Sequence, residues 1–434
     1  MRISLLFSLF VLTLTPYLSA QECTGRYREK VFEKVKLSGT IPFASNPMAG
    51  GGLRELNYDF YEPEGDTASQ RPLVIIWHGG AFLDLFNKRS PDIVMIAHEL
   101  VQRGYVVISP DYRGLKSIGS FLKERDVIEE VVRSVIDGND LVCRVMDDIE
   151  NKGNPHRINK DEIFAGGVSG GAILGLHLLF LENLDQMPPQ YAAWARTVDG
   201  GRADIALANK YCTANPIKGF INISGALLDT AWIKKTDVTL IHYHGDKDFI
   251  VPYDQDRPLF GLQTLPIING SKPIHEKAVK EGIQSTFEDY KGRGHVPFLN
   301  LNIEDISDLL NIVSGGLVDE AIFYENIGAM VDFLAAQVEC EKAVQPTPVF
   351  NNSYLALNIY PNPADGQFRV NLGKSAKWNM DIRDISGRLI SSDIFTGQQF
   401  SKDTRQLNAG MYVVQITPAD NSALTGYSGK LIIR

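Results

Sequence analysis

Residues 167–171 read Gly-Val-Ser-Gly-Gly and lie between two apolar segments. Ile163-Phe164-Ala165 before them has the pattern of a short buried strand, and Ala172 to Phe180 after them has the pattern of an apolar helix. Ser169 is therefore expected on a sharp strand-to-helix turn, where the flanking glycines are a steric requirement. The first N–H groups of such a helix stabilise negative charge. The stretch predicts a nucleophilic serine, although a chain with 38 glycines can match the pattern by chance.

A glycine pair follows an earlier apolar strand of the chain. His78-Gly79-Gly80-Ala81-Phe82 comes directly after Leu73-Val74-Ile75-Ile76. Glycine lets backbone N–H groups approach a ligand closely, so we expect the N–H groups of Gly80, Ala81 and Gly170 to form an oxyanion hole. The histidine of this segment is expected to hold the loop. The alternative interpretation is an ordinary glycine turn.

A serine nucleophile needs a base and an acid later in the chain. His295 lies among glycines and a proline, directly after the predicted strand Gln284–Tyr290, so it is the expected base on a loop. The strand that begins at Leu240 ends in a turn with two aspartates, Asp246 and Asp248. We favour Asp248 as the acid because it lies further into the loop, whereas Asp246 suits a turn-forming role.

The order Ser169, Asp248, His295 is that of nucleophile, acid and base on an α/β-hydrolase sheet. With these motifs the chain resembles the α/β-hydrolase superfamily over about residues 30–340, in particular carboxylesterases and lipases with an HGG-type oxyanion loop. The resemblance implies a mostly parallel sheet flanked by helices and a Ser-Asp-His acyl-enzyme mechanism that needs no metal or organic cofactor. Ala81 stands where many such esterases have a third glycine. Its N–H donor remains, but its methyl group narrows the space beside the acyl pocket.

Charge and targeting signals restrict the partners and the location. The net charge of −9 is spread along the 434 residues without a basic stripe, which argues against nucleic acid as a partner. Met1 to Ala20 has the layout of a secretory signal peptide, and no other apolar stretch approaches the length of a transmembrane helix. We expect an exported protein whose mature chain begins at Gln21.

The four cysteines all lie in the predicted mature chain, and an even number in an exported protein favours disulfides. Three pairings are possible. We favour Cys23 with Cys340 and Cys143 with Cys212, and the sequence contains no C-x-x-C metal spacing.

The composition changes at residues 344–354, which read as a linker between a catalytic domain at 21–343 and a domain at 355–434. The last domain has short alternating segments at 368–372, 380–384, 411–416 and 430–433. These predict a small all-β, sandwich-like module.

This C-terminal module resembles the type IX secretion sorting domain of Bacteroidota. The resemblance rests on Ile359–Pro363, Asp384–Arg388, Leu407–Tyr412 and Gly429–Arg434. It implies recognition by the type IX machinery and passage through the periplasm of a Gram-negative bacterium, ending in release or in attachment to the cell surface. The alternative is a carbohydrate-binding or other adhesive β-sandwich.

These observations together predict a secreted serine carboxylic-ester hydrolase. The expected export suggests three classes of substrate: acetyl or feruloyl esters on polysaccharides, lipids, and polyesters. The long connections Glu182–Ala214 and Tyr253–Ile283 are expected to border the pocket. Two alternatives stay open: a prolyl-type serine exopeptidase, and a catalytically silent binding protein with the hydrolase fold.

Overall fold

The computed structural model describes residues 25–209, 215–299, 318–338, 355–384, 389–419 and 426–433. The chain divides into two compact units, Met1–Cys340 and Glu341–Arg434. The predicted signal peptide at 1–20 and the predicted linker at 344–354 lie outside the described residues. Within the described ranges, no helix is both long and apolar enough to cross a membrane.

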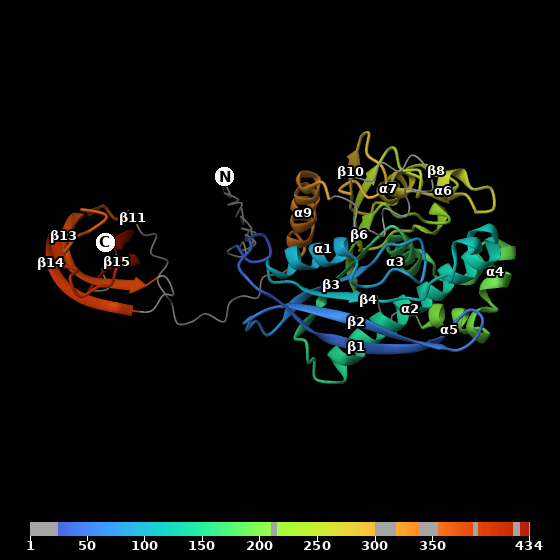
Figure 1. Ribbon diagram of the computed structural model, residues 1–434, viewed down its shortest axis with the longest axis horizontal. Helices are drawn as coiled ribbons and strands as arrows, with labels where there is room; N and C mark the ends of the chain where they lie inside the picture. Colours follow the sequence, from blue (N-terminus) through green and yellow to red (C-terminus); the bar gives the residue numbers. More distant parts are fainter. Residues whose placement is uncertain are drawn as a thin grey trace, which may run out of the picture. The chain divides into compact units, whose positions relative to one another are not determined.

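Eight strands among the described residues of the first unit form one sheet in the order β1-β2-β4-β3-β5-β6-β7-β10 (Figure 1). The strands of this sheet are β1 (Val35–Pro47), β2 (Leu53–Pro63), β3 (Arg71–Trp77), β4 (Val106–Pro110), β5 (Ile158–Val168), β6 (Ile217–Ile223), β7 (Thr239–Gly245) and β10 (Ser285–Tyr290). Strands β1 and β2 pair antiparallel, and β2 pairs antiparallel with β4. From β4 to β10 all neighbours are parallel. The mostly parallel sheet predicted from the sequence is confirmed.

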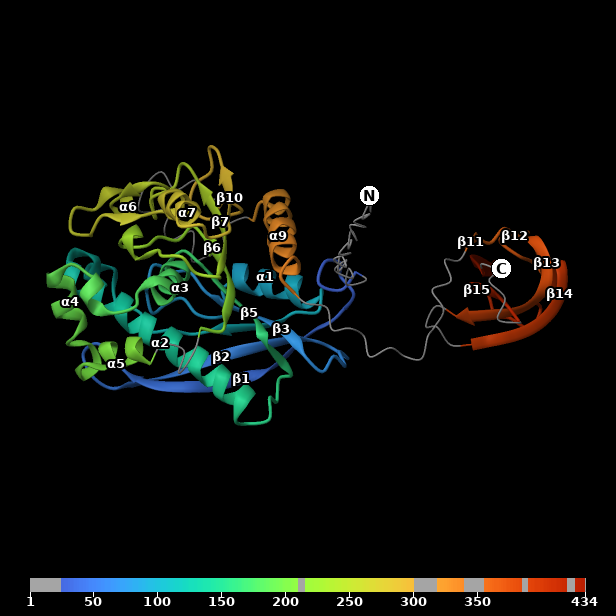
Figure 2. The same cartoon turned by 180° about the vertical axis from the view of Figure 1, so that it is seen from behind.

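Helices connect these strands and cover both faces of the sheet (Figures 1 and 2). The α-helices are α1 (Pro91–Val101), α2 (Glu124–Glu150), α3 (Gly170–Phe180), α4 (Pro189–Ala195), α5 (Arg202–Ala208), α6 (Pro258–Gly261), α7 (Ser271–Lys280) and α9 (Glu320–Ala335). The 3-10 turns are η1 (Ile118–Leu122), η2 (Leu184–Gln186), η3 (Val198–Gly200) and η5 (Thr230–Trp232), and a separate hairpin joins β8 (Gln255–Asp256) to β9 (Ile268–Asn269).

The sheet separates two apolar cores because successive side chains of a strand point to opposite faces. In β3, Leu73 and Ile75 pack into the core that contains α2 and α3, whereas Val74 and Ile76 pack into the core that contains α1 and α9. All seven residues of β3 are buried, as expected for a central strand covered on both sides.

The parallel arrangement brings the predicted site residues to one edge of the sheet. His78 follows β3, Ser169 follows β5, Asp248 lies just beyond β7 and His295 lies just beyond β10. The carboxyl ends of parallel strands meet at the same edge, which is where open α/β sheets place their sites. Residues more than a hundred positions apart therefore become neighbours.

The second unit is all-β, as the sequence predicts, but its described strands form one sheet in place of the expected sandwich-like arrangement. Its strand pairs are antiparallel except the pair of Leu355–Ala356 with Tyr427–Ile433, which is parallel. The strands of this sheet are β11 (Leu355–Ala356), β12 (Ile359–Tyr360), β13 (Gln367–Asp384), β14 (Leu389–Asp403), β15 (Gly410–Pro418) and β16 (Tyr427–Ile433). The predicted segments 368–372 and 380–384 belong to the single strand β13, whose pairing with β14 shifts register between Asn371 and Ala376 but continues beyond it. Strand β14 was not predicted.

Cys143 is disulfide-bonded, and the described residues include no free cysteine. Cys23, Cys212 and Cys340 lie outside the described residues. The favoured pairings therefore stay predictions.

Candidate active site

Ser169 lies on a strained turn between β5 and α3. Its backbone has φ 51° and ψ −117°, a conformation that costs a non-glycine residue roughly 1–3 kcal/mol. An added Cβ on Gly167 would lie 2.4 Å from the carbonyl carbon of Gly171, and one on Gly171 would lie 2.4 Å from the carbonyl oxygen of His78. Both glycines are therefore required for the turn to close. The Ser169 N–H donates to the carbonyl of Ile223 at 2.8 Å and ties the turn to β6.

Three predicted side chains meet at the sheet edge through two hydrogen bonds. The Ser169 hydroxyl donates to Nε2 of His295 at 2.8 Å, and Nδ1–H of His295 donates to Oδ2 of Asp248 at 2.7 Å. All three residues are buried. This arrangement can move the serine proton to the imidazole while a carboxylate balances the resulting charge.

Asp248 is held by four donors. Its Oδ1 accepts the N–H groups of Ile250 at 2.8 Å and Val251 at 2.9 Å. Its Oδ2 accepts Nδ1–H of His295 and also Nε2–H of His244, the latter at 3.0 Å. Burial alone would raise the pKa of Asp248, but the two histidines outweigh burial, so its pKa lies well below the usual range. The carboxylate is ionised at neutral pH.

The loops after β7 and β10 are locked to each other. Oδ1 of Asp246 accepts the N–H of Gly292 at 2.6 Å. This second aspartate bonds to backbone, as expected, but to that of the other loop and not within its own turn. On the other side of His295, the N–H of Val296 donates to Oγ of Ser224 at 3.1 Å. These contacts fix the path of the chain on both sides of the imidazole.

His78 supports the glycine loop instead of entering the site. Its Nδ1 lies 2.7 Å from the carbonyl oxygen of Gly79, and its ring stacks on Tyr112 with 4.4 Å between centroids. The Tyr112 hydroxyl donates to the carbonyl of His78 at 2.9 Å. Gly80 has φ 115°, and a Cβ there would overlap the side chain of Phe86. Only glycine fits that position.

The glycine loop faces the first turn of α3. The backbone nitrogens of Ala81 and Phe82 lie 3.5 Å and 3.3 Å from where a Cβ of Gly170 would be. The predicted donors Ala81 and Gly170 are thus neighbours beside Ser169. Gly80 belongs to the same loop, and Phe82 adds a candidate N–H donor that the sequence analysis missed. Phe82 has a positive φ of 56°, an angle that no sequence pattern signals.

A cleft of about 870 Å³, including space open to solvent, begins at Ser169. Both connections expected to border the pocket do so, through Met187 from the first and five residues of the second. The sequence analysis did not anticipate that α2 supplies a whole wall. The residues that line the cleft are Ala81, Phe82, Phe121, Val127, Ile128, Val131, Val132, Val135, Ser169, Gly170, Ile173, His177, Leu181, Met187, Leu228, Ile250, Val251, Pro258, Leu259, Leu265, Pro266 and Ile268.

A buried hydrogen-bond network continues from Asp248 into the protein. Nδ1 of His244 accepts the hydroxyl proton of Ser271 at 2.7 Å, and Oγ of Ser271 accepts Nδ2–H of Asn222 at 3.0 Å. Asn222 also donates to Nδ1 of His242 at 2.9 Å. The spacing of His244 and Asp248, four residues apart on one turn, is the only sequence signal of this support.

Comparisons with known proteins give two results. Residues 358–434 match the family described as secretion system C-terminal sorting domain. A search of curated proteins finds no match.

Similar solved structures include three forms of esterase 2 from Thermogutta terrifontis. The form phosphoramylated by tabun is 14% identical, with a TM-score of 0.44, over 69% of this chain and 96% of that chain. The butyrate-bound form is 16% identical, with a TM-score of 0.39, over 65% and 90%. The native form is 15% identical, with a TM-score of 0.40, over 74% and 98%.

Proposed function

We propose that the chain is a secreted serine carboxylic-ester hydrolase. The observation that carries the proposal is the continuous hydrogen-bonded series from Ser169 through His295 to Asp248, with the serine on a strained turn at the mouth of an apolar cleft. A hydroxyl that donates to an imidazole, itself oriented by a buried carboxylate, is the arrangement that activates serine as a nucleophile.

In the acylation step, Oγ of Ser169 attacks the ester carbonyl carbon while Nε2 of His295 takes the hydroxyl proton. Asp248 accepts Nδ1–H of the resulting imidazolium and stabilises its charge. The tetrahedral intermediate then collapses, the bond to the alkoxy oxygen breaks, and His295 passes its proton to the leaving alcohol. An acyl-enzyme remains on Ser169.

In the deacylation step, His295 removes a proton from a water molecule, which attacks the acyl carbonyl. Collapse of the second intermediate returns the proton to Ser169 and releases the carboxylic acid. The negative charge of both intermediates lies on the former carbonyl oxygen. We assign the N–H groups of Gly80, Ala81 and Gly170 to bind it, with Phe82 as a further donor.

The test is hydrolysis of p-nitrophenyl butyrate by the purified protein. Ser169→Ala should reduce kcat by at least about 10⁴-fold, since the nucleophile is lost. A fluorophosphonate probe should label the wild type on Ser169 and leave Ser169→Ala unlabelled. Absence of labelling on folded wild-type protein would refute the proposal and favour the silent binding protein.

The same assay separates an esterase from a prolyl-type exopeptidase. The described wall of the cleft is aliphatic and aromatic, which suits an acyl group better than the charged amino terminus of a peptide. We expect p-nitrophenyl esters to be hydrolysed and Xaa-Pro anilides to be left intact. Faster cleavage of the anilides would reverse the assignment.

For localisation, we propose export by the type IX system, with residues 355–434 as the sorting domain. The match of residues 358–434 to secretion sorting domains supports this. Deleting residues 355–434 should cause the enzyme to accumulate in the periplasm of a host with the type IX machinery. Normal appearance of the truncated protein outside the cell would contradict the proposal.

A further inference from the structure

The cleft beside Ser169 extends along one face of α3. Gly170, Ile173 and His177 lie on that face, and Leu181 follows at the end of the helix. The eleven residues of α3 span roughly 16 Å. The opposite wall is a face of α2 formed by the segment 127–135. The cleft is thus a long slot between two helices, with the nucleophile at one end.

The one titratable side chain on the floor of this slot is electrically neutral. Nδ1–H of His177 donates to the carbonyl of Ile173 at 2.8 Å, and Nε2 accepts the N–H of Leu228 at 3.3 Å. Burial lowers the pKa of His177 to about 4. No charged side chain is among the described residues that line the slot. The described lining therefore offers apolar contact along the slot, and the ring nitrogens of His177 are already hydrogen-bonded.

The position of the base decides which half of an ester enters the slot. His295 must reach the leaving alcohol, and His295 does not line the slot. The alcohol therefore points toward His295, while the acyl group extends from Ser169 between α2 and α3. An acetyl group would leave most of the slot empty. A feruloyl group would place its phenolic hydroxyl among aliphatic side chains without a partner, which is costly.

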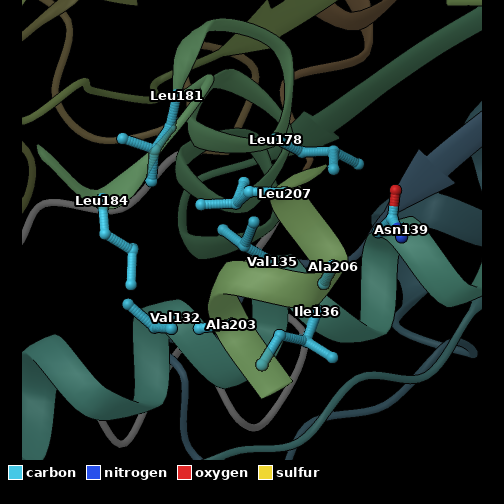
Figure 3. Close-up of a pocket in the computed structure, with 10 residues that line it drawn as sticks. All are labelled: Val132, Val135, Ile136, Asn139, Leu178, Leu181, Leu184, Ala203, Ala206 and Leu207. Carbon is cyan, nitrogen blue, oxygen red and sulfur yellow. The ribbon is translucent and has the colours of Figure 1, made fainter. Parts of the chain in front are cut away.

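A second apolar hollow lies at the far end of the slot. Its lining residues come from α2, α3, η2 and α5 and from Leu181 (Figure 3). Three residues line both spaces: Val132, Val135 and Leu181. Because these three side chains line both spaces, they form the wall between the slot and the hollow. Leu207, by contrast, lines the hollow alone.

Two exposed aromatic side chains are sequence neighbours of residues that line the slot. Phe249 and Phe260 are stacked with 6.1 Å between ring centroids and are exposed. They adjoin Ile250 and Leu259, which line the slot. They add exposed apolar surface beside the slot.

From this geometry we propose that the enzyme acts on esters of medium-chain aliphatic acids, and that Leu181, with Val132 and Val135, sets the upper limit of chain length. This inference rests on the proposed esterase activity and selects among its substrates. Aliphatic acyl chains of intermediate length fill the slot, and longer ones meet the wall at Leu181.

The first experiment measures kcat/KM for p-nitrophenyl acetate, butyrate, octanoate and dodecanoate and for a feruloyl ester, below aggregate-forming concentrations. Each methylene that enters an apolar pocket adds to discrimination, so octanoate should exceed acetate by at least about 10-fold and dodecanoate should fall below octanoate. A preference for the acetyl or feruloyl ester would overturn the inference. If a fluorophosphonate still labels Ser169, this outcome concerns chain length alone and leaves the esterase proposal standing.

The second experiment compares two Leu-to-Ala variants. Leu181→Ala breaches the wall and should raise the dodecanoate-to-octanoate ratio of kcat/KM about 10-fold. Leu207→Ala removes the same atoms from the hollow without breaching the wall, so its ratio should stay within about 2-fold of wild type. Circular dichroism verifies folding, and Val135→Ala replaces Leu181→Ala if the latter does not fold. Equal shifts in the breaching and control variants, or no shift in either, would refute the role of the wall.

Discussion

Asp248 is the residue on which the imidazole depends, because its Oδ2 accepts the Nδ1–H of His295 and its Oδ1 is already occupied by two backbone donors. In Asp248→Asn, the amide nitrogen replaces either Oδ1 or Oδ2. At either position it faces N–H groups that need an acceptor, and it can only donate. The imidazole of His295 then adopts the tautomer with the proton on Nε2, which can no longer accept the proton of the Ser169 hydroxyl. We predict that kcat for p-nitrophenyl butyrate falls about 10⁴-fold.

Asp246→Asn is the matched control for this prediction. Asp246 accepts a backbone N–H from Gly292, and the amide oxygen of asparagine can accept the same bond. Its kcat should stay within about 3-fold of wild type. If the two variants lose equal activity, Asp248 is not the acid of the site.

His244 is a positioning residue for the acid. Its Nε2–H donates to Asp248 and its Nδ1 accepts from Ser271, so it joins the carboxylate to a buried network. His244→Leu removes a hydrogen bond to a charged group, and we predict a loss of about 10-fold in kcat with little change in KM. Because glutamine can donate to the same carboxylate, His244→Gln should recover part of kcat. Equal kcat in the two variants would show that the bond to Asp248 is not what matters.

At the scale of elements, the turn between β5 and α3 is closed by sterics. A Cβ on Gly171 would meet the carbonyl oxygens of Trp77 and His78, both at 2.4 Å. These are backbone atoms of a central strand and the loop that follows it, so moving them aside would disrupt the sheet. We predict that Gly171→Ala lowers the free energy of unfolding by more than about 2 kcal/mol and abolishes activity, measured by urea unfolding and ester hydrolysis.

Gly328 provides the matched control in α9. It is an exposed helical glycine, and a Cβ there would have no heavy atom within 4 Å. Gly328→Ala should raise the free energy of unfolding by about 0.5–1 kcal/mol, because alanine loses less backbone entropy in a helix. Destabilisation by both substitutions to a similar degree would contradict the steric account of the turn.

The elements around Ser169 were predicted correctly from the sequence, whereas strand β13 of the second unit was not. The strand before Ser169 and the helix after it were predicted because glycines separate two continuous apolar runs. In the second unit, 368–372 and 380–384 were predicted as two separate strands. The structure instead joins both segments in β13, which continues across a register shift because it pairs with β14 on both sides of it.

For the whole molecule, three buried histidines make stability depend on pH. Burial lowers the pKa of His78 and His177 to about 4, and burial with the nearby His275 and His244 lowers that of His242 to about 3. In the unfolded chain each has a pKa of about 6.5. On account of these three histidines the unfolded state binds between two and three more protons from about pH 6 down to pH 4.5. Asp92 opposes this, because burial raises its pKa to about 6 and the folded state then binds up to about one proton more there.

Because the unfolded state binds more protons, stability is fully present above about pH 6.5 and falls as the pH drops below it. We predict that the free energy of unfolding declines by about 2–3 kcal/mol per pH unit near pH 5, measured by urea unfolding. Glutamine can replace both hydrogen bonds of His177 without titrating, so His177→Gln should reduce this slope by about 1 kcal/mol per pH unit. If the pH dependence of the free energy of unfolding is unchanged in that variant, His177 does not contribute to it.

The two units have separate apolar cores with no residue in common. Truncation after residue 343 should therefore leave kcat/KM for p-nitrophenyl butyrate within about 2-fold of the full chain, measured on purified protein. Loss of activity in a truncated protein that still shows the circular dichroism of a mixed α/β fold would mean that the C-terminal unit supports catalysis.

The sequence by itself determined the class of sheet, the strained serine turn and the identities of the serine, aspartate and histidine that meet there. These follow from local rules: glycine is needed where the chain turns sharply, and parallel strands deliver their following loops to one edge. Only the tertiary structure decided that α2 walls the slot, that His244 supports Asp248 and that Phe82 faces Gly170. Those contacts join segments far apart in the chain or depend on single backbone angles, and neither leaves a periodic pattern in the sequence.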